Sequence, residues 1–391
     1  MLETLAYFEQ LGTLVDQRWA VRGRSPQSLA EVATEALLEV PVPDAITPGS
    51  ILDRLVDGAD LPKQRPASDQ FGQPPVVMYR AGDLEVQALV WMDGTTSIHQ
   101  HGFDGAFRVF SGSSLHVPYG FTAGEVLADD HLVVGDLSMG DPEILWPGDV
   151  RPIVSGGGFI HALFHLEHPS VTIVVRNTSS DLPFPQYSYR LPGLGFDELH
   201  SDDRMLMRLR GLRALHQIDP TRAGESALEV VRSQDLWQSF RLCDYWAQTV
   251  GDGPELAALI EVLSARAGPL SEIIGPVYAE DQRRWRLLAR RSMLRESHHR
   301  MFLALIVNLP DRASIHSAVA QLFPDMDPDQ VVMDWVQELS GPEFRGVSGL
   351  RMGADDLALL RTQLSDGQTD DALDVVASRW KPPMMIEKLF A

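Results

Sequence analysis

Residues 95–102 read Thr95-Thr96-Ser97-Ile98-His99-Gln100-His101-Gly102, with two histidines two positions apart in a run that favours β structure. A β-strand sends residues i and i+2 to the same face of its sheet, so His99 and His101 should point at one spot. A third imidazole from a neighbouring strand would complete a neutral three-nitrogen site for a divalent metal ion.

The chain offers three later histidines for that third position: His161, His165 and His168. The first two share a face if their strand is regular, so both stay open as ligands, with His161 preferred. His168 precedes Pro169, and a turn is expected there.

Outward from the H-x-H pair, residues 76–176 alternate short apolar runs with turns rich in Gly and Asp. Many short strands at this spacing predict a sandwich or barrel. Two further histidines of the region, His116 and His131, are expected at surface or hairpin positions. The expected strands cover residues 76–80, 85–92, 96–101, 107–110, 115–117, 131–137, 143–146, 151–154, 159–164 and 170–176.

Helical spacing flanks the strand region on both sides. Residues 2–19 form one amphipathic pattern, Ser25-Pro26 supplies an N-cap and an N1 proline for a second helix, and a short helix is expected near 51–56. A proline-rich exit follows the strands at residues 181–195. Further helices are expected over 202–216, 224–249, 254–266, 270–294, 296–308, 313–323, 328–339, 354–364 and 370–379.

We therefore predict an α+β multidomain chain. It consists of an N-terminal helical arm and linker (1–75), an antiparallel β-barrel (76–195) and an all-helical domain (196–391). The helical domain is expected to act as a lid over the barrel, as a homodimer interface or as a partner-binding surface.

The charge of the chain limits its partners. There are 54 acidic and 33 basic residues, a net charge of −21, which repels nucleic acid and anionic membranes. Cys243 is the single cysteine, so no intrachain disulfide forms, and neither a signal peptide nor a long apolar run is evident. We expect a cytoplasmic protein with a small-molecule partner.

The strand region resembles the cupin superfamily. Residues 156–161, Gly-Gly-Gly-Phe-Ile-His, match its second motif weakly and make His161 the third ligand candidate. The first cupin motif has a glycine, an H-x-H pair, a glutamate and a later glycine, matched here by Gly94, His99, His101, Gly105 in the glutamate position, and Gly112. Because glycine cannot ligate a metal, the resemblance implies a site made of histidines alone.

Within the cupins, residues 76–178 are most similar to cysteine dioxygenases, thiol dioxygenases that hold iron with three histidines. The resemblance rests on Tyr79-Arg80, the run Val86-Gln87-Ala88-Leu89-Val90-Trp91 and the H-x-H pair. In that family an arginine at the position of Arg80 holds the substrate carboxylate, and the resemblance implies the same role here. A rim ion pair is the alternative for Arg80.

The chain also departs from that family. The family's active-site tyrosine falls at Arg176, and a histidine two residues earlier falls at Val174. The Cys–Tyr crosslink of the animal enzymes cannot form, because Cys243 lies outside the predicted barrel. The metal site is thus expected to be similar while the substrate is not cysteine, and Arg80 and Arg176, if both face the cavity, favour an acidic substrate.

Together these features predict a mononuclear non-haem iron dioxygenase that acts on a small anionic or thiol-bearing metabolite with O₂. The predicted ligands are His99, His101 and His161, with Arg80 and Arg176 as catalytic residues. Fe(II) is the expected metal, with Zn, Ni or Mn as alternatives. Two other hypotheses remain: a redox-inert metal-dependent isomerase, lyase or hydrolase, and a non-catalytic ligand-binding or regulatory cupin.

The helical half contains one further histidine motif, Glu296-Ser297-His298-His299. Carboxylate-bridged di-iron bundles use two E-x-x-H pairs, and Asp197-Glu198-Leu199-His200 is a loose second copy. A solvated, charged helix face is the preferred interpretation of the motif.

Overall fold

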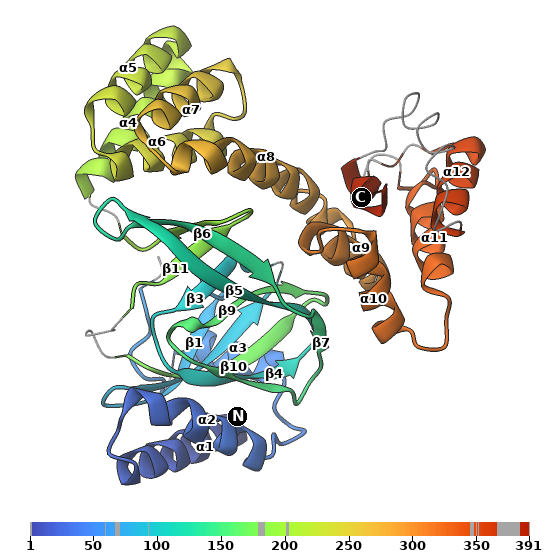
Figure 1. The fold of residues 1–391 in the computed structure, drawn as a ribbon. Helices are drawn as coiled ribbons and strands as arrows, with labels where there is room; N and C mark the ends of the chain where they lie inside the picture. Colours follow the sequence, from blue (N-terminus) through green and yellow to red (C-terminus); the bar gives the residue numbers. More distant parts are fainter. Residues whose placement is uncertain are drawn as a thin grey trace.

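The computed structural model describes residues 2–58, 60–66, 71–92, 94–178, 184–200, 203–344, 348, 350, 352–365 and 384–390. A barrel of antiparallel strands occupies the middle of the molecule, with helices before and after it (Figure 1). The fold class predicted from the sequence, an antiparallel β-barrel with an N-terminal helical arm and C-terminal helices, is confirmed. In the described part of the chain, no helix combines the length and apolarity needed to cross a membrane.

Three helices precede the barrel: α1 (Leu2–Val21), α2 (Pro26–Glu39) and α3 (Pro48–Asp57). The Ser25 side chain accepts a hydrogen bond from the Ser28 amide and Pro26 occupies N1, so the predicted cap is confirmed. Apolar side chains of α1 and α2, including Phe8, Leu11 and Leu37, are fully buried. They pack in one cluster with apolar residues of β1, β2, β4 and β10, so these helices cover one side of the barrel.

The strands form two antiparallel sheets, ordered β1-β2-β10-β4-β8 and β6-β12-β11-β3-β9-β5-β7. The strands are β1 (Pro75–Ala81), β2 (Leu84–Trp91), β3 (Ile98–His101), β4 (Gly105–Ser111), β5 (Ser114–Leu127), β6 (Leu132–Met139), β7 (Glu143–Leu145), β8 (Val150–Ile153), β9 (Gly156–His165), β10 (Ser170–Asn177), β11 (Tyr187–Arg190) and β12 (Leu194–Asp197).

Two of these strands replace part of the expected exit segment. Residues 181–195 are predicted as a proline-rich exit, but β11 pairs with β3, and β12, which begins at Leu194, pairs with β6. Residues 181–183 of that segment lie outside the described residues. Tertiary pairing supplies the backbone hydrogen bonds here, and proline-rich composition does not reveal it.

Alternation along the strands separates an inner from an outer face. Outward-facing residues of β3, β5 and β9, such as Ile98, Val117 and Phe164, belong to a cluster with residues of α9, α10 and α11. The inward-facing side chains are more aromatic, and a separate cluster includes Trp91, Phe103, Phe107, Leu163 and Val174. The barrel therefore has helices on both sides and its own interior.

The glycine at the glutamate position of the cupin motif has a steric reason. A Cβ at Gly105 would lie 1.9 Å from the carbonyl oxygen of Val175 on β10, far inside van der Waals contact. No side chain fits there without moving two paired strands. The structure thus explains why a carboxylate ligand is missing at this position.

Helices continue after the barrel in two groups (Figure 1). Helices α4 to α7 pack together with the first part of α8, and α9 to α12 form the second group. The bounds are α4 (Asp203–Ile218), α5 (Pro220–Ser233), α6 (Leu236–Thr249), α7 (Pro254–Arg266), α8 (Leu270–Leu288), η1 (Arg291–Met293), α9 (Ser297–Asn308), α10 (Arg312–Leu322), α11 (Pro328–Leu339), α12 (Ala354–Ser365) and η2 (Met384–Phe390).

Two expected helices are shorter than predicted. The segment 224–249 is divided between α5 and α6, because the Asp235 side chain accepts the Gln238 amide and starts a new helix. The segment 270–294 ends its α-helix at Leu288 and continues as the short η1. The helix expected over 370–379 lies outside the described residues.

Candidate metal centre

Strands β3 and β9 bring the predicted ligands together. His99 lies directly opposite His161 in the antiparallel ladder, and directly paired residues share a face. His101 joins them from two positions along β3, and one nitrogen of each ring lies within 4.8 Å of the others. The three side chains are 2–6% exposed. The structure thus places His99, His101 and His161 in one group inside the barrel.

The distance between two of these rings suits a shared ion. Nε2 of His101 lies 3.1 Å from Nε2 of His161. Two imidazole nitrogens bound about 2.1 Å from one metal at a right angle are about 3.0 Å apart. The pair is therefore already spaced as neighbouring ligands of one metal ion.

His99 is oriented by the backbone. Its Nδ1 lies 2.8 Å from the carbonyl oxygen of Ser97, which can only accept, so we assign the proton to Nδ1. Nε2 of His99 then carries the lone pair. Metal-binding histidines commonly donate their second nitrogen to a carbonyl or carboxylate in this way.

His161 is oriented by a chain of side chains that starts at the barrel edge. Arg151 Nε donates to Glu143 Oε1 at 2.9 Å, and His116 Nδ1 lies 2.9 Å from the same oxygen. His116 Nε2 in turn lies 3.1 Å from His161 Nδ1. Hydrogen bonds from His116 and Arg151 lower the pKa of Glu143 to about 2, so Glu143 accepts as a carboxylate.

The protons along this chain leave a lone pair at its inner end. Because Glu143 accepts from Nδ1 of His116, the neutral form of His116 accepts at Nε2, where His161 donates from Nδ1. Nε2 of His161 therefore carries a lone pair that faces His101. Burial lowers the pKa of His99 and is the largest cause of that change. Burial also lowers the pKa values of His101 and His161 well below the usual value, and the charges of neighbouring histidines, and of Arg176 at His101, lower them further. The group is a set of neutral nitrogen donors, which fits a divalent cation.

Aromatic rings surround the histidines. The ring of Phe159 lies 4.4 Å from that of His161, Phe71 lies 5.3 Å from His99, and Phe103 lies 4.8 Å from His101. A dry, apolar wall strengthens electrostatic interactions at a metal and limits the access of water.

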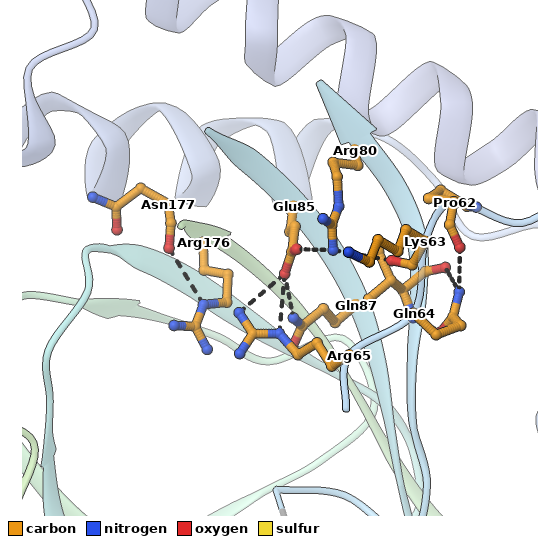
Figure 2. A network of polar contacts seen from close by, with 10 residues as sticks. Pro62, Lys63, Gln64, Arg65, Arg80, Glu85, Gln87, Arg176 and Asn177 are labelled. Atoms are coloured by element: carbon orange, nitrogen blue, oxygen red, sulfur yellow. Dashed lines mark hydrogen bonds and ion pairs between the residues drawn. The ribbon is translucent and has the colours of Figure 1, made fainter. Parts of the chain in front are cut away.

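Arg80 lies at the end of β1, beside Glu85 of β2, as Figure 2 shows. It forms an ion pair with the buried Glu85 and donates to the carbonyl oxygen of Lys63 at 3.0 Å. Arg65 binds the same carboxylate at 3.1 Å, and Gln87 also donates to it. This ion pair matches the alternative that the sequence left open for Arg80, and a contact of Arg80 with the substrate stays a prediction.

Arg176 lies on β10, opposite Glu85 of β2 and Gly105 of β4. Its guanidinium carbon lies 3.7 Å from the centre of the Phe103 ring, and Nε donates to the Asn177 carbonyl oxygen at 3.3 Å (Figure 2). Its positive charge contributes to the lowered pKa of His101, after burial and His99. Of the two predicted arginines, Arg176 is the one that acts electrostatically on the histidine group.

Two other histidines of the barrel differ in their roles. His165 is fully buried but lies outside the group; its Nδ1 is 2.9 Å from Ser114 Oγ and its ring stacks on Trp91. The expectation that His116 lies at the surface is wrong, since it is 2% exposed and contacts His161. The prediction stopped the strand at residue 117, whereas β5 runs to Leu127 and pairs His116 with the inward Leu163.

A cavity of about 600 Å³ lies between the barrel and α8. Its lining includes Ser97, Ser188, Glu198, Arg284 and Trp285. The three histidines do not line this cavity, but two of its lining residues contact His99. The Ser97 carbonyl oxygen lies beside His99 Nδ1, and Ser188 of β11 lies opposite His99 of β3. No pattern in the sequence indicates this cavity, because its walls come from segments about 100 residues apart in the chain.

His116 and Glu143 should act as positioning residues for the metal ligand His161. We expect Glu143→Gln and His116→Leu to lower metal affinity by roughly 10- to 100-fold, the usual cost of losing such a partner. Competition with a chelator of known affinity measures the change. Glu125→Gln is the control, because it removes an exposed charge from β5, the strand that carries His116. An affinity equal to wild type in both variants would show that His161 needs no such support.

Comparisons with known proteins give partial likenesses. No protein-family model matches the chain, and no curated protein matches it. Among solved structures it resembles DMSP lyases (20% identity, 27% of this chain and 44% of that chain, TM-score 0.19). It also resembles a cupin-2 domain protein from Shewanella frigidimarina (15% identity, 32% of this chain and 92% of that chain, TM-score 0.20). A third similar structure is an oxalate oxidase (16% identity, 34% of this chain and 57% of that chain, TM-score 0.19).

The solved structures that the chain resembles thus include cupin proteins. The matched part of the chain spans less than half the length of the DMSP lyase chain. Identities and TM-scores this low leave its function to be argued from its own residues. The similarity to cysteine dioxygenases stays a prediction from the sequence.

Proposed function

We propose that this chain is a mononuclear metal enzyme whose ion is held by His99, His101 and His161, and that it is an Fe(II)-dependent dioxygenase of a small anionic or thiol-bearing molecule. One observation carries the proposal: three buried, neutral imidazoles meet inside an aromatic-lined barrel without a carboxylate among them. Fe(II) bound there would supply open coordination positions for substrate and O₂.

The charges around the group support an anionic substrate. Three neutral ligands leave the +2 charge of the ion uncompensated, so an anionic donor gains from binding it, although the negative charge of Glu198 also acts on His99. Arg176 adds a second positive charge, which acts on His101. Glu85 is neutralised by Arg80 and Arg65, so it does not oppose an anion. We assign to Arg176 the orientation of the anionic group of the substrate.

The protein's own residues do the rest of the work. Ser97 and His116 keep the metal-facing nitrogens of His99 and His161 unprotonated. Phe103, Phe107 and Phe159 exclude water from the interior, which protects a reactive site from side reactions. The cavity lined by Ser97 and Ser188 lies between the barrel and α8, and we propose that the substrate approaches from there.

Oxygen consumption tests the proposal. Purified chain, stripped of metal and reloaded with Fe(II), should consume O₂ in an oxygen electrode when given thiol-carboxylates other than cysteine, such as 3-mercaptopropionate, or other small carboxylates. Loading with Zn, Ni or Mn should give no O₂ uptake, and His99→Ala should abolish it.

A redox-inert isomerase, lyase or hydrolase uses the same imidazole donors as a Lewis-acid site. It would be favoured if the Zn, Ni or Mn form converts a substrate under strict anaerobiosis. O₂ uptake that is equal in the wild type and His99→Ala would overturn the iron proposal.

A further inference from the structure

Three metal-ligating side chains also meet outside the barrel, where α9 begins and α11 ends. His298 and His299 lie in the first turn of α9, and Glu338 lies in the last turn of α11. Nε2 of each histidine is 2.9 Å from the same oxygen, Oε2 of Glu338. One nitrogen or oxygen of each residue lies within 4.8 Å of the others, as in the barrel group.

The geometry of these histidines is not that of two independent surface residues. Consecutive residues of an α-helix point about 100° apart, yet the two ring centres are 4.1 Å apart and both nitrogens face one oxygen. For bonds of about 2.0–2.1 Å to one ion, nitrogen and oxygen ligands are separated by about 2.9–3.5 Å. The observed 2.9 Å lies at the short end of that range.

Burial is graded across the group. His299 is 2% exposed and packs edge-on against Phe344, whereas the side chains of His298 and Glu338 are 42% and 53% exposed. In His299, Nε2 contacts Glu338, whereas Nδ1 has no hydrogen-bond partner among the described residues. Glu296, just before α9, adds negative charge near His299. The group thus has one fixed donor and two donors open to an ion from solvent.

We infer that His298, His299 and Glu338 form a second metal site, which takes one Zn²⁺-like divalent cation independently of the ion proposed in the barrel. Two imidazoles and one carboxylate are donors that Zn²⁺ binds at neutral pH, with water in the remaining position. The proposal goes beyond the proposed enzymatic function, because it concerns a different part of the chain and requires no reaction.

This site differs from both interpretations of the motif Glu296-Ser297-His298-His299. The di-iron alternative needs the loose second copy beside it, but His200 groups with His131 and Asp197 instead. The expectation of a solvated helix face holds for Glu296 and Ser297, which are exposed, and for the partly exposed His298, whereas His299 is buried. The third ligand comes from α11, 40 residues after His298, which no local motif reveals.

An ion at this site would join α11 to the turn of α9 that docks on the barrel. Arg300, next to His299, donates to the carbonyl oxygens of Leu166 and His165 at 2.9 and 3.1 Å. Binding of Zn²⁺ to the folded chain should therefore stabilise the contact between the last helices and the barrel, and raise the midpoint of thermal unfolding.

The experiment counts ions in the full-length protein. Metal-stripped chain is incubated with excess Zn²⁺ at pH 7.5, freed of unbound metal by gel filtration and analysed by elemental mass spectrometry. We expect two equivalents in the wild type and one in Glu338→Gln, which alters a half-exposed side chain. Glu343→Gln, which removes a nearby exposed charge, should keep two.

His99→Ala separates this site from the barrel. It should lose the barrel equivalent and keep the α9–α11 equivalent, and its thermal midpoint should still rise with Zn²⁺, whereas that of His99→Ala combined with Glu338→Gln should not. Two equivalents retained in Glu338→Gln would overturn the inference. So would a His99→Ala variant that retains no zinc, even if the barrel site proves to be an iron enzyme.

Discussion

A chain in which His161 is replaced by alanine should lose the barrel metal, with affinity reduced by more than about 100-fold. His161 is the only predicted ligand from β9 that reaches His99 and His101 among the described residues. Its loss removes one of three donors and leaves His116 without the nitrogen that it orients. Loss of a supporting residue alone costs about 10- to 100-fold, so loss of the ligand should cost more.

His165→Ala is the matched control, because His165 lies four residues later on the same face of β9. The His165 ring contacts Ser114 and stacks on Trp91 rather than on the metal ligands, so His165→Ala should keep its barrel metal. The variant should lose some stability, because it leaves a cavity beside Trp91. Chelator competition measures affinity, and denaturant unfolding measures stability. Metal lost from His165→Ala but kept by His161→Ala would reverse the assignment of the third ligand.

Arg300→Leu should cost about 1–3 kcal/mol of stability, the range for leaving a buried hydrogen-bonding group without its partner. Arg300 has no exposed surface. Its guanidinium binds the carbonyl oxygens of Leu166, His165 and Arg291 and also contacts His168. Leucine fills part of the space but removes the donor to the Leu166 carbonyl oxygen, while the His165 and Arg291 carbonyl oxygens keep the Arg291 side chain and the Leu294 amide as donors.

Urea unfolding followed by circular dichroism measures this loss. Arg295→Leu removes an exposed arginine five residues earlier and should change stability by less than about 0.5 kcal/mol. Arg300→Lys should fall between the two, because one ammonium cannot reach all the carbonyls that a guanidinium reaches. Stability within about 1 kcal/mol of wild type in Arg300→Leu would show that α9 does not depend on this contact.

Local patterns in the sequence predicted most of the elements. Short apolar runs separated by Gly and Asp turns predicted the ten strands from 76 to 176, and Ser25-Pro26 predicted the start of α2, because these signals act through neighbouring residues. The division between α5 and α6 also had a local signal, the capping Asp235, which the helical pattern concealed. By contrast, β11 and β12 exist through pairing with β3 and β6.

The candidate site divides in the same way. The H-x-H spacing fixed the shared face of His99 and His101, and a glycine at position 105 excluded a carboxylate ligand there, both from the sequence by itself. Cross-strand register decided the rest: it set His161 opposite His99, brought His116 behind His161 and paired Arg80 with Glu85. Register is fixed by which strands meet and how they are aligned, and that depends on packing of the whole chain rather than on any one segment.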